Sequence, residues 1–213
     1  MDSVISVLEM IGLFAFAVTG SLEAIKSKND LLGVLILGVT TSVGGGIIRD
    51  LILGINPPNA FANPRYIYIA TLVSFFVFIL FYYNKKILGN PSPKYFDEIL
   101  TFSDAIGLAV FTVLGMNVAF SLSTDFRGVI YVFVGLISGV GGGILRDVML
   151  NKVPYILDRN IYASASILGA VAYYLFMKYD VFYPTMSMVF SMIIIFTTRM
   201  YAAKNNLHLP KVD

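Results

Sequence analysis

The groups in this sequence that are best suited to chemistry are charged residues within apolar stretches, and they occur twice in one pattern. Three glycines, two apolar residues and an arginine–aspartate pair follow one another at residues 44–50 and again at 141–147. Upstream of each copy, an acid begins a second shared pattern, acidic-x-x-Gly-x-x-x-Phe, at residues 9–16 and 104–111. The positions singled out are Glu9, Gly44, Gly45, Gly46, Arg49, Asp50, Asp104, Gly141, Gly142, Gly143, Arg146 and Asp147. Charges in apolar stretches are costly and usually face a partner or water, so these positions are the candidate functional residues.

Other kinds of chemistry are poorly represented. The sequence has no cysteine and a single histidine, His208, which excludes disulfides, thiolate catalysis and histidine metal clusters. No nucleophile–base pair is visible, so we expect neither an enzyme nor a cofactor. The net charge of +2 implies no bulk attraction to nucleic acid.

The composition indicates an integral membrane protein. Hydrophobic residues make up 57 % of the chain and charged residues 13 %, against roughly 45–50 % and about 25 % in soluble domains. A soluble fold of this size has too little interior to bury so much apolar surface. The N-terminal apolar run is not a cleavable signal, because no basic segment precedes it and Glu9 interrupts it.

We expect an all-α fold with seven transmembrane helices, because each apolar run approaches the ~20 residues that cross a bilayer. The runs are Val4–Ile25, Leu31–Leu53, Tyr66–Tyr83, Thr101–Leu122, Arg127–Leu150, Ile161–Met177 and Val181–Met200. Short loops rich in basic residues stay in the cytoplasm, and the two sides of the expected membrane divide the basic residues ten to three. The larger set is Lys26, Lys28, Lys85, Lys86, Lys94, Lys152, Arg159, Arg199, Lys204 and Lys211; the smaller is Arg65, Arg127 and Lys178. This bias places the N-terminus outside and the C-terminus in the cytoplasm.

The repeated patterns divide the chain, residues 1–213, into two units within a single membrane domain. One unit covers about residues 4–83 and the other about 101–177, with an extra helix at about 181–200. Because each unit has an odd number of spans, the second must enter the membrane from the opposite side. Inverted repeats of this kind are common in transporters. The alternative is that duplication merely built a larger bundle.

The glycine triplets have two readings. Small residues at four-residue spacing let helices approach closely in lipid, which would make the glycines packing devices. Each glycine also costs about 1 kcal/mol of helix propensity, so a triplet predicts a kink or break at 44–46 and at 141–143. Backbone carbonyls freed there, at Gly44, Gly45, Gly141 and Gly142, are the places where a monovalent cation would bind.

The charged residues should form one acid–arginine–acid cluster near each membrane face. Glu9 would join Arg49 and Asp50, and Asp104 would join the second arginine–aspartate pair. The alternative is that the arginines snorkel to lipid headgroups, since both lie about one turn from a span end. Six tyrosines stand near span ends, as in an aromatic belt: Tyr66, Tyr68, Tyr82, Tyr83, Tyr173 and Tyr174. By aligning Arg65-x-Ile-Tyr with Arg159-x-Ile-Tyr, we match Tyr68 to Tyr162.

The doubled Gly-Gly-Gly-x-x-Arg-Asp motif, the acidic pattern before each copy and the three-plus-three-plus-one spans resemble the trimeric intracellular cation channel (TRIC) family. The resemblance covers about residues 4–203. Within the family the chain resembles the prokaryotic branch in particular, whose domain is also named glycine transporter. It implies a homotrimer with one pore per protomer, passing potassium and sodium, with helices two and five kinked at the glycine triplets. It also implies the same orientation, with the N-terminus outside.

Two functions follow from these observations. The first is a channel for monovalent cations in the cell membrane of a prokaryote, in contact with lipid, with the acids giving cation preference and the arginines limiting over-tight binding. The second is a carrier for a small amino acid, glycine, whose carboxylate would bind a helix N-terminus and whose ammonium would bind an acid.

Overall fold

The computed structural model describes residues 2–88, 93–122, 127–158 and 161–207. The predicted turn at 123–125, Arg159, His208 and Lys211 lie outside these residues. Within the described ranges every regular element is a helix. The long helices are α1 (Asp2–Lys26), α2 (Leu31–Ile52), α4 (Arg65–Leu88), α5 (Pro93–Leu122), α6 (Gly128–Met149), α8 (Ala163–Lys178) and α9 (Pro184–Lys204). Two short helices, α3 (Asn59–Ala62) and α7 (Tyr155–Asp158), follow α2 and α6.

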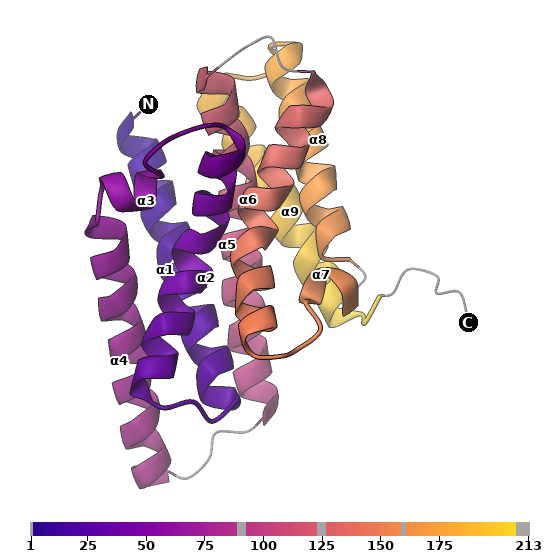
Figure 1. Cartoon of the computed structure of the whole chain (residues 1–213). Helices are drawn as coiled ribbons and strands as arrows, with labels where there is room; N and C mark the ends of the chain where they lie inside the picture. Colours follow the sequence, from indigo (N-terminus) through magenta and orange to yellow (C-terminus); the bar gives the residue numbers. More distant parts are fainter. Residues whose placement is uncertain (1, 89–92, 123–126, 159–160, 208–213) are drawn as a thin grey trace.

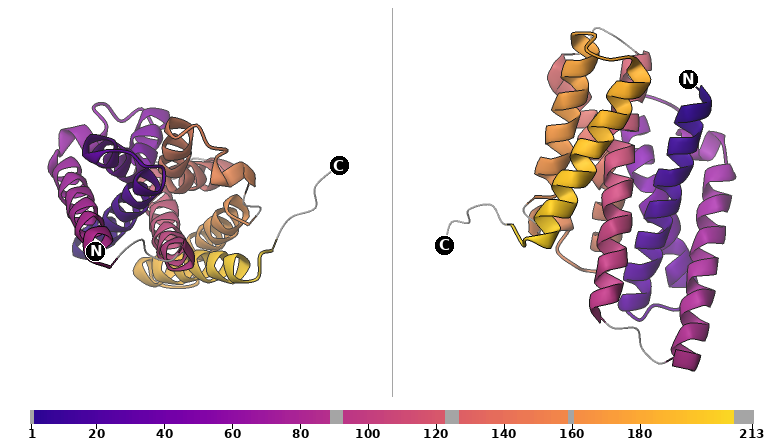
Figure 2. Two further views of the ribbon diagram at one scale, coloured as in Figure 1. Left: turned by 90° about the horizontal axis from the view of Figure 1, so that it is seen from below. Right: turned by 180° about the vertical axis from the view of Figure 1, so that it is seen from behind.

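The long helices form one bundle and run up and down in turn (Figures 1 and 2). We call the end at which α1 begins the N-side and the end at which α9 finishes the C-side. α1 runs from the N-side to the C-side, whereas α5 runs in the opposite direction (Figure 1). The same reversal holds for α2 and α6, which lie side by side in the middle of the bundle.

The helices agree with the expected all-α membrane fold. Six of them in the described residues are long and apolar enough to cross a membrane. α8 is apolar but has only 16 residues, about 24 Å of helix against a hydrocarbon core of about 30 Å. The expected loop at Asn84–Glu98 is partly helical, since α5 already begins at Pro93. The short helices α3 and α7 stand where the sequence indicates only loops.

The glycine triplets lie where α2 and α6 cross, and they bring the two backbones together. A Cβ added at Gly45 would stand 2.2 Å from the carbonyl oxygen of Ser138, and one at Gly142 would stand 2.0 Å from that of Thr41. Only glycine allows so close an approach. Both helices continue through their triplets without interruption, so neither is broken there, and a kink at the triplets stays a prediction. The physical reason is that each helix packs closely against the other, which offsets the low helix propensity of glycine and keeps the backbone hydrogen bonds intact.

A second reciprocal contact joins α1 to α5. Phe16 packs where a side chain on Gly107 would be, and Phe111 packs against Gly12. The two rings stack with centroids 5.4 Å apart. Each helix therefore offers its glycine to the other helix's phenylalanine, which fixes how α1 and α5 are rotated relative to one another.

Candidate functional site

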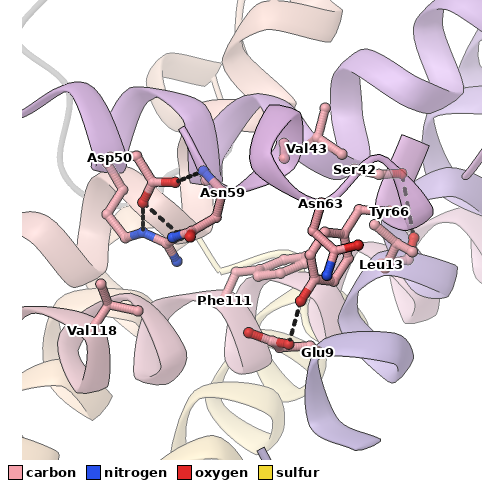
Figure 3. A pocket seen from close by; sticks show the side chains of 13 residues that line it. Glu9, Leu13, Ser42, Val43, Asp50, Asn59, Asn63, Tyr66, Phe111 and Val118 are labelled. Carbon is pink, nitrogen blue, oxygen red and sulfur yellow. Dashed lines mark hydrogen bonds and ion pairs between the residues drawn. The ribbon is translucent and has the colours of Figure 1, made fainter. Parts of the chain in front are cut away.

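Arg49 and Asp50 form a buried ion pair at the N-side end of α2 (Figure 3). The Asp50 Oδ1 atom accepts from Arg49 Nε at 2.8 Å and lies 2.7 Å from the arginine's Nη2 atom. The Asp50 Oδ2 atom accepts from the backbone N–H of Asn59, at the start of α3, at 2.8 Å. Both oxygens of this carboxylate are therefore occupied, and its charge is balanced by the neighbouring guanidinium.

Glu9 belongs to the same site but does not pair with Arg49, so the expected three-residue cluster is wrong in this contact. Its Oε2 atom accepts from the Tyr66 hydroxyl at 2.8 Å. Figure 3 shows two separate groups, Asp50 with Asn59 and Glu9 with Tyr66. The reason lies in α4, which places Tyr66 next to Glu9. This carboxylate therefore keeps a negative charge that no arginine or lysine neutralises by direct contact among the described residues.

A polar cavity of about 230 Å³ lies between these two groups. Its walls combine charged and amide side chains with apolar ones from α1, α2, α3, α4 and α5. The lining residues are Glu9, Leu13, Ser42, Val43, Gly46, Arg49, Asp50, Asn59, Ala60, Asn63, Tyr66, Phe111 and Val118. This volume has room for several water molecules, so the N-side site is suited to a small hydrated ion or a small polar molecule.

The C-side cluster has the contacts that the sequence predicts. Arg146 donates through Nε to Asp147 at 2.8 Å and through Nη1 to Asp104 at 3.3 Å. The Tyr162 hydroxyl also donates to Asp104, at 3.4 Å. All three charged residues are 0 % exposed, so this arginine does not snorkel to a lipid headgroup. The cluster is closed off from solvent, unlike its N-side counterpart.

The two clusters have the same local design. Asp147 Oδ2 accepts from the backbone N–H of Tyr155 at 2.9 Å, as Asp50 Oδ2 accepts from that of Asn59. The structural counterpart of Tyr162 is thus Tyr66, because each donates its hydroxyl to the acid of the upstream pattern.

The sequence match of Tyr68 to Tyr162 therefore does not extend to this hydrogen bond, which Tyr66 makes in the first unit. Tyr68 is 66 % exposed, as a residue of the aromatic belt would be, whereas Tyr66 lines the cavity. The hydroxyl of Tyr173, also expected in the belt, instead lies inside the bundle and donates to Asn117.

Two further groups were not predicted as functional. Glu23, which is 2 % exposed, accepts from Lys152 Nζ at 2.7 Å and from the Tyr155 hydroxyl. Its place inside the run Val4–Ile25 was a signal that could have identified it, since an acid within a span calls for a partner. Arg199, counted above among the basic residues of the cytoplasmic side, is 3 % exposed within α9, and its guanidinium lies 5.2 Å over the ring of Tyr162.

The glycines of each triplet occupy different surroundings. Gly46 lines the N-side cavity. Gly143 stands in the corresponding place on the C-side, where an added Cβ would be 3.4 Å from the Tyr162 hydroxyl. Gly44 and Gly141 face the opposite helix at the α2–α6 contact. In the described residues no three His, Cys, Asp or Glu side chains gather as a metal site, and cation binding at the glycine carbonyls stays a prediction.

Comparisons with known proteins agree over nearly the whole chain. Residues 6–82 and 101–178 each match the glycine transporter family. The UPF0126 inner membrane protein YadS of Escherichia coli is 39 % identical over 95 % of this chain and 93 % of its own. The crystal structure of a prokaryotic TRIC channel, 33 % identical, covers 98 % of this chain and 100 % of its own with a TM-score of 0.86. The TRIC orthologue from Rhodobacter sphaeroides, also 33 % identical, covers 96 % and 100 % with a TM-score of 0.85.

Proposed function

This chain belongs to the glycine transporter family, and we propose that it is a passive channel for monovalent cations, potassium and sodium, with a polar path through each protomer. The observation that carries the proposal is the likeness to TRIC channel structures over 98 % of the chain. That likeness comes with 33 % sequence identity, which is high enough for function to be compared as well as fold. The homotrimer is part of the proposal and is supported by the relative from Rhodobacter sphaeroides, which is described as trimeric.

The charges along the proposed path favour cations. Among the residues that line the N-side cavity, one guanidinium faces two carboxylates, Glu9 and Asp50, so their sum is one negative charge. A second guanidinium, that of Arg65, is exposed outside this lining and donates to the Tyr66 hydroxyl rather than to Glu9. Since Asp50 is saturated by Arg49 and Asn59, Glu9 is the group left to attract a cation. A single carboxylate beside neutral amides and a hydroxyl would bind a cation weakly. Weak binding suits conduction, because an ion must leave as readily as it enters.

We propose that the path passes from the N-side cavity to the C-side cluster along the α2–α6 contact, as part of an inverted repeat. The reciprocal packing of Gly45 on Ser138 and Gly142 on Thr41 supports a two-fold relation between the halves. The two separate matches to one family support it as well. A bend at the triplets would open this contact and expose glycine carbonyls to the ion.

The N-side cavity would face the outside of a prokaryotic cell, with the C-terminus in the cytoplasm. The ten-to-three division of basic residues supports this orientation, and it survives the burial of Arg199, which leaves nine against three. A reporter fused after Asp213 should be cytoplasmic and one inserted at 56–65 external. Finding both on one side would refute the inverted arrangement.

The function itself is tested with purified protein in planar bilayers and in proteoliposomes. A channel should give discrete current steps in potassium chloride, with a reversal potential that shows cation preference, and no glycine dependence. Liposomes loaded with glycine then test the alternative, the carrier. Glycine flux that saturates, with no unitary currents, would refute the channel and establish the carrier.

The carrier remains the second candidate because of one feature of the N-side cavity. Both Glu9 and Arg49 line it, so the ammonium of a small zwitterion would have a carboxylate partner and its carboxylate a guanidinium partner. The Arg49 Nε and Nη2 atoms are already directed at Asp50, however. Arg49 is therefore already paired with Asp50 instead of being free for a substrate carboxylate, which favours the channel over the carrier.

A further inference from the structure

We propose that Glu23, Lys152 and Tyr155 form a clasp that closes the C-side end of the path and acts as its gate. The inference rests on the proposed path between the two clusters and adds the element that controls it. Glu23 comes from α1, in the first half of the chain, whereas Lys152 and Tyr155 come from the segment after α6 in the second half. The clasp therefore ties the halves together at one end.

The contacts of the clasp use both oxygens of one buried carboxylate. Lys152 Nζ donates to Glu23 Oε2 at 2.7 Å, and the Tyr155 hydroxyl donates to Oε1. Because hydrogen bonds to a charged, buried group are among the stronger ones in proteins, Glu23 holds both partners firmly. It is the only acid of α1 that contacts residues beyond α6 in the described interactions.

Tyr155 is placed to block access to the C-side cluster. Its backbone N–H bonds Asp147, and its ring lies 4.8 Å from the guanidinium carbon of Arg146 and 6.4 Å from the Tyr162 ring. The ring therefore covers the groups that an ion would have to pass. With its hydroxyl held by Glu23, the ring is fixed at both ends.

The N-side lacks these groups, and there the site is open. Asn59 stands where Tyr155 stands, since each gives its backbone N–H to the aspartate of its arginine–aspartate pair. Glu9 and Asp104 are 95 positions apart (104 − 9), and the same spacing takes Glu23 to Val118 (23 + 95). Both Asn59 and Val118 line the N-side cavity. The N-side, with an asparagine and a valine at these places, contains a cavity. The C-side, with a tyrosine and a glutamate, is closed.

Opening would then consist of releasing Tyr155 from Glu23, so that the ring leaves Arg146 and water reaches Asp104. The chain provides a direct test of that access, because it contains no cysteine. Gly46 and Gly143 occupy corresponding places in the two triplets, and a Cβ at either makes no contact shorter than 3.4 Å. A single cysteine introduced at either position reports whether water-soluble reagents enter that half.

The experiment measures the rate at which a charged methanethiosulfonate reagent modifies each cysteine variant in detergent, followed by mass spectrometry. Gly46→Cys should react quickly and Gly143→Cys slowly. Adding Glu23→Gln or Tyr155→Phe to Gly143→Cys should raise its rate by about tenfold or more, since a charge-assisted hydrogen bond is lost. Lys26→Gln is the matched control, because it removes an exposed ion pair with Asp97 at the same end of the bundle.

An unchanged rate for Gly143→Cys in both clasp variants would overturn the gate, as would an equal rise with Lys26→Gln. Single-channel recording of Glu23→Gln without any cysteine adds an independent measurement, in which a higher open probability at unchanged unitary conductance supports the clasp. If no variant conducts while the Gly143→Cys rate still rises, the clasp stands and the channel is refuted. The two proposals therefore fail in different ways.

Discussion

The contact between α2 and α6 is the feature whose disturbance has the most calculable result. A Cβ at Gly142 would lie 2.0 Å from the Thr41 carbonyl oxygen and 3.0 Å from its carbonyl carbon. Both atoms belong to the backbone of a continuous helix, so no side-chain rotation relieves the overlap. Gly142→Ala therefore requires that α2 and α6 move apart.

The size of the effect follows from the overlap. Bringing the Cβ from 2.0 Å to an ordinary contact of about 3.4 Å means a local displacement of about 1.4 Å. Overpacking of this kind costs roughly 1–3 kcal/mol, and alanine returns up to about 1 kcal/mol of helix propensity. A net loss of up to about 2 kcal/mol corresponds to a fall of up to about 8 °C in the unfolding temperature of a protein of this length.

Thermal unfolding of the purified protein in detergent provides the measurement, and Gly143→Ala provides the control. At Gly143, one position along the same triplet, the nearest atom to an added Cβ is the Tyr162 hydroxyl at 3.4 Å. This variant gains the same helix propensity without the clash, so its unfolding temperature should stay level or rise. If Gly142→Ala proves as stable as Gly143→Ala, the triplets do not act through close packing of the two backbones.

Three further predictions concern the charged residues. Arg146→Gln leaves Asp104 unpaired in the interior and should lower the free energy of unfolding by about 3–5 kcal/mol. Adding Asp104→Asn should restore part of that free energy. Additivity of the two effects within about 0.5 kcal/mol in the double-mutant cycle would contradict the pairing. Arg199→Met should cost less than about 1 kcal/mol, because Nε and Nη2 of this guanidinium lack hydrogen-bond partners and, among the described interactions, its contact with the Tyr162 ring is the one lost. A loss as large as that of Arg146→Gln would contradict this. Glu9→Gln should shift the reversal potential of a potassium chloride gradient towards that of a non-selective pore, and an unchanged potential would remove this residue from the cation path.

The sequence by itself determined the membrane class, the doubled motifs and the approximate helix boundaries. These are one-dimensional properties, because a bilayer selects long apolar segments regardless of their neighbours. The Arg49–Asp50 and Arg146–Asp147 pairs were also predictable, because charges inside an apolar span call for a partner, although neighbouring residues of a helix do not face one another. The single long-range pair foreseen correctly, Arg146 with Asp104, relied on the repeat.

The tertiary structure alone decided which side chains from different helices meet. Glu9 bonds Tyr66 rather than Arg49, and Glu23 bonds Tyr155, because contacts between helices depend on the rotation of each helix about its axis. For α1 and α5 that rotation is set by the packing of Phe16 on Gly107 and of Phe111 on Gly12, which no local spacing reports. For the same reason the triplets could not be assigned to packing or breakage in advance: glycine lowers helix propensity in isolation, but a second helix pressed against it keeps the backbone helical.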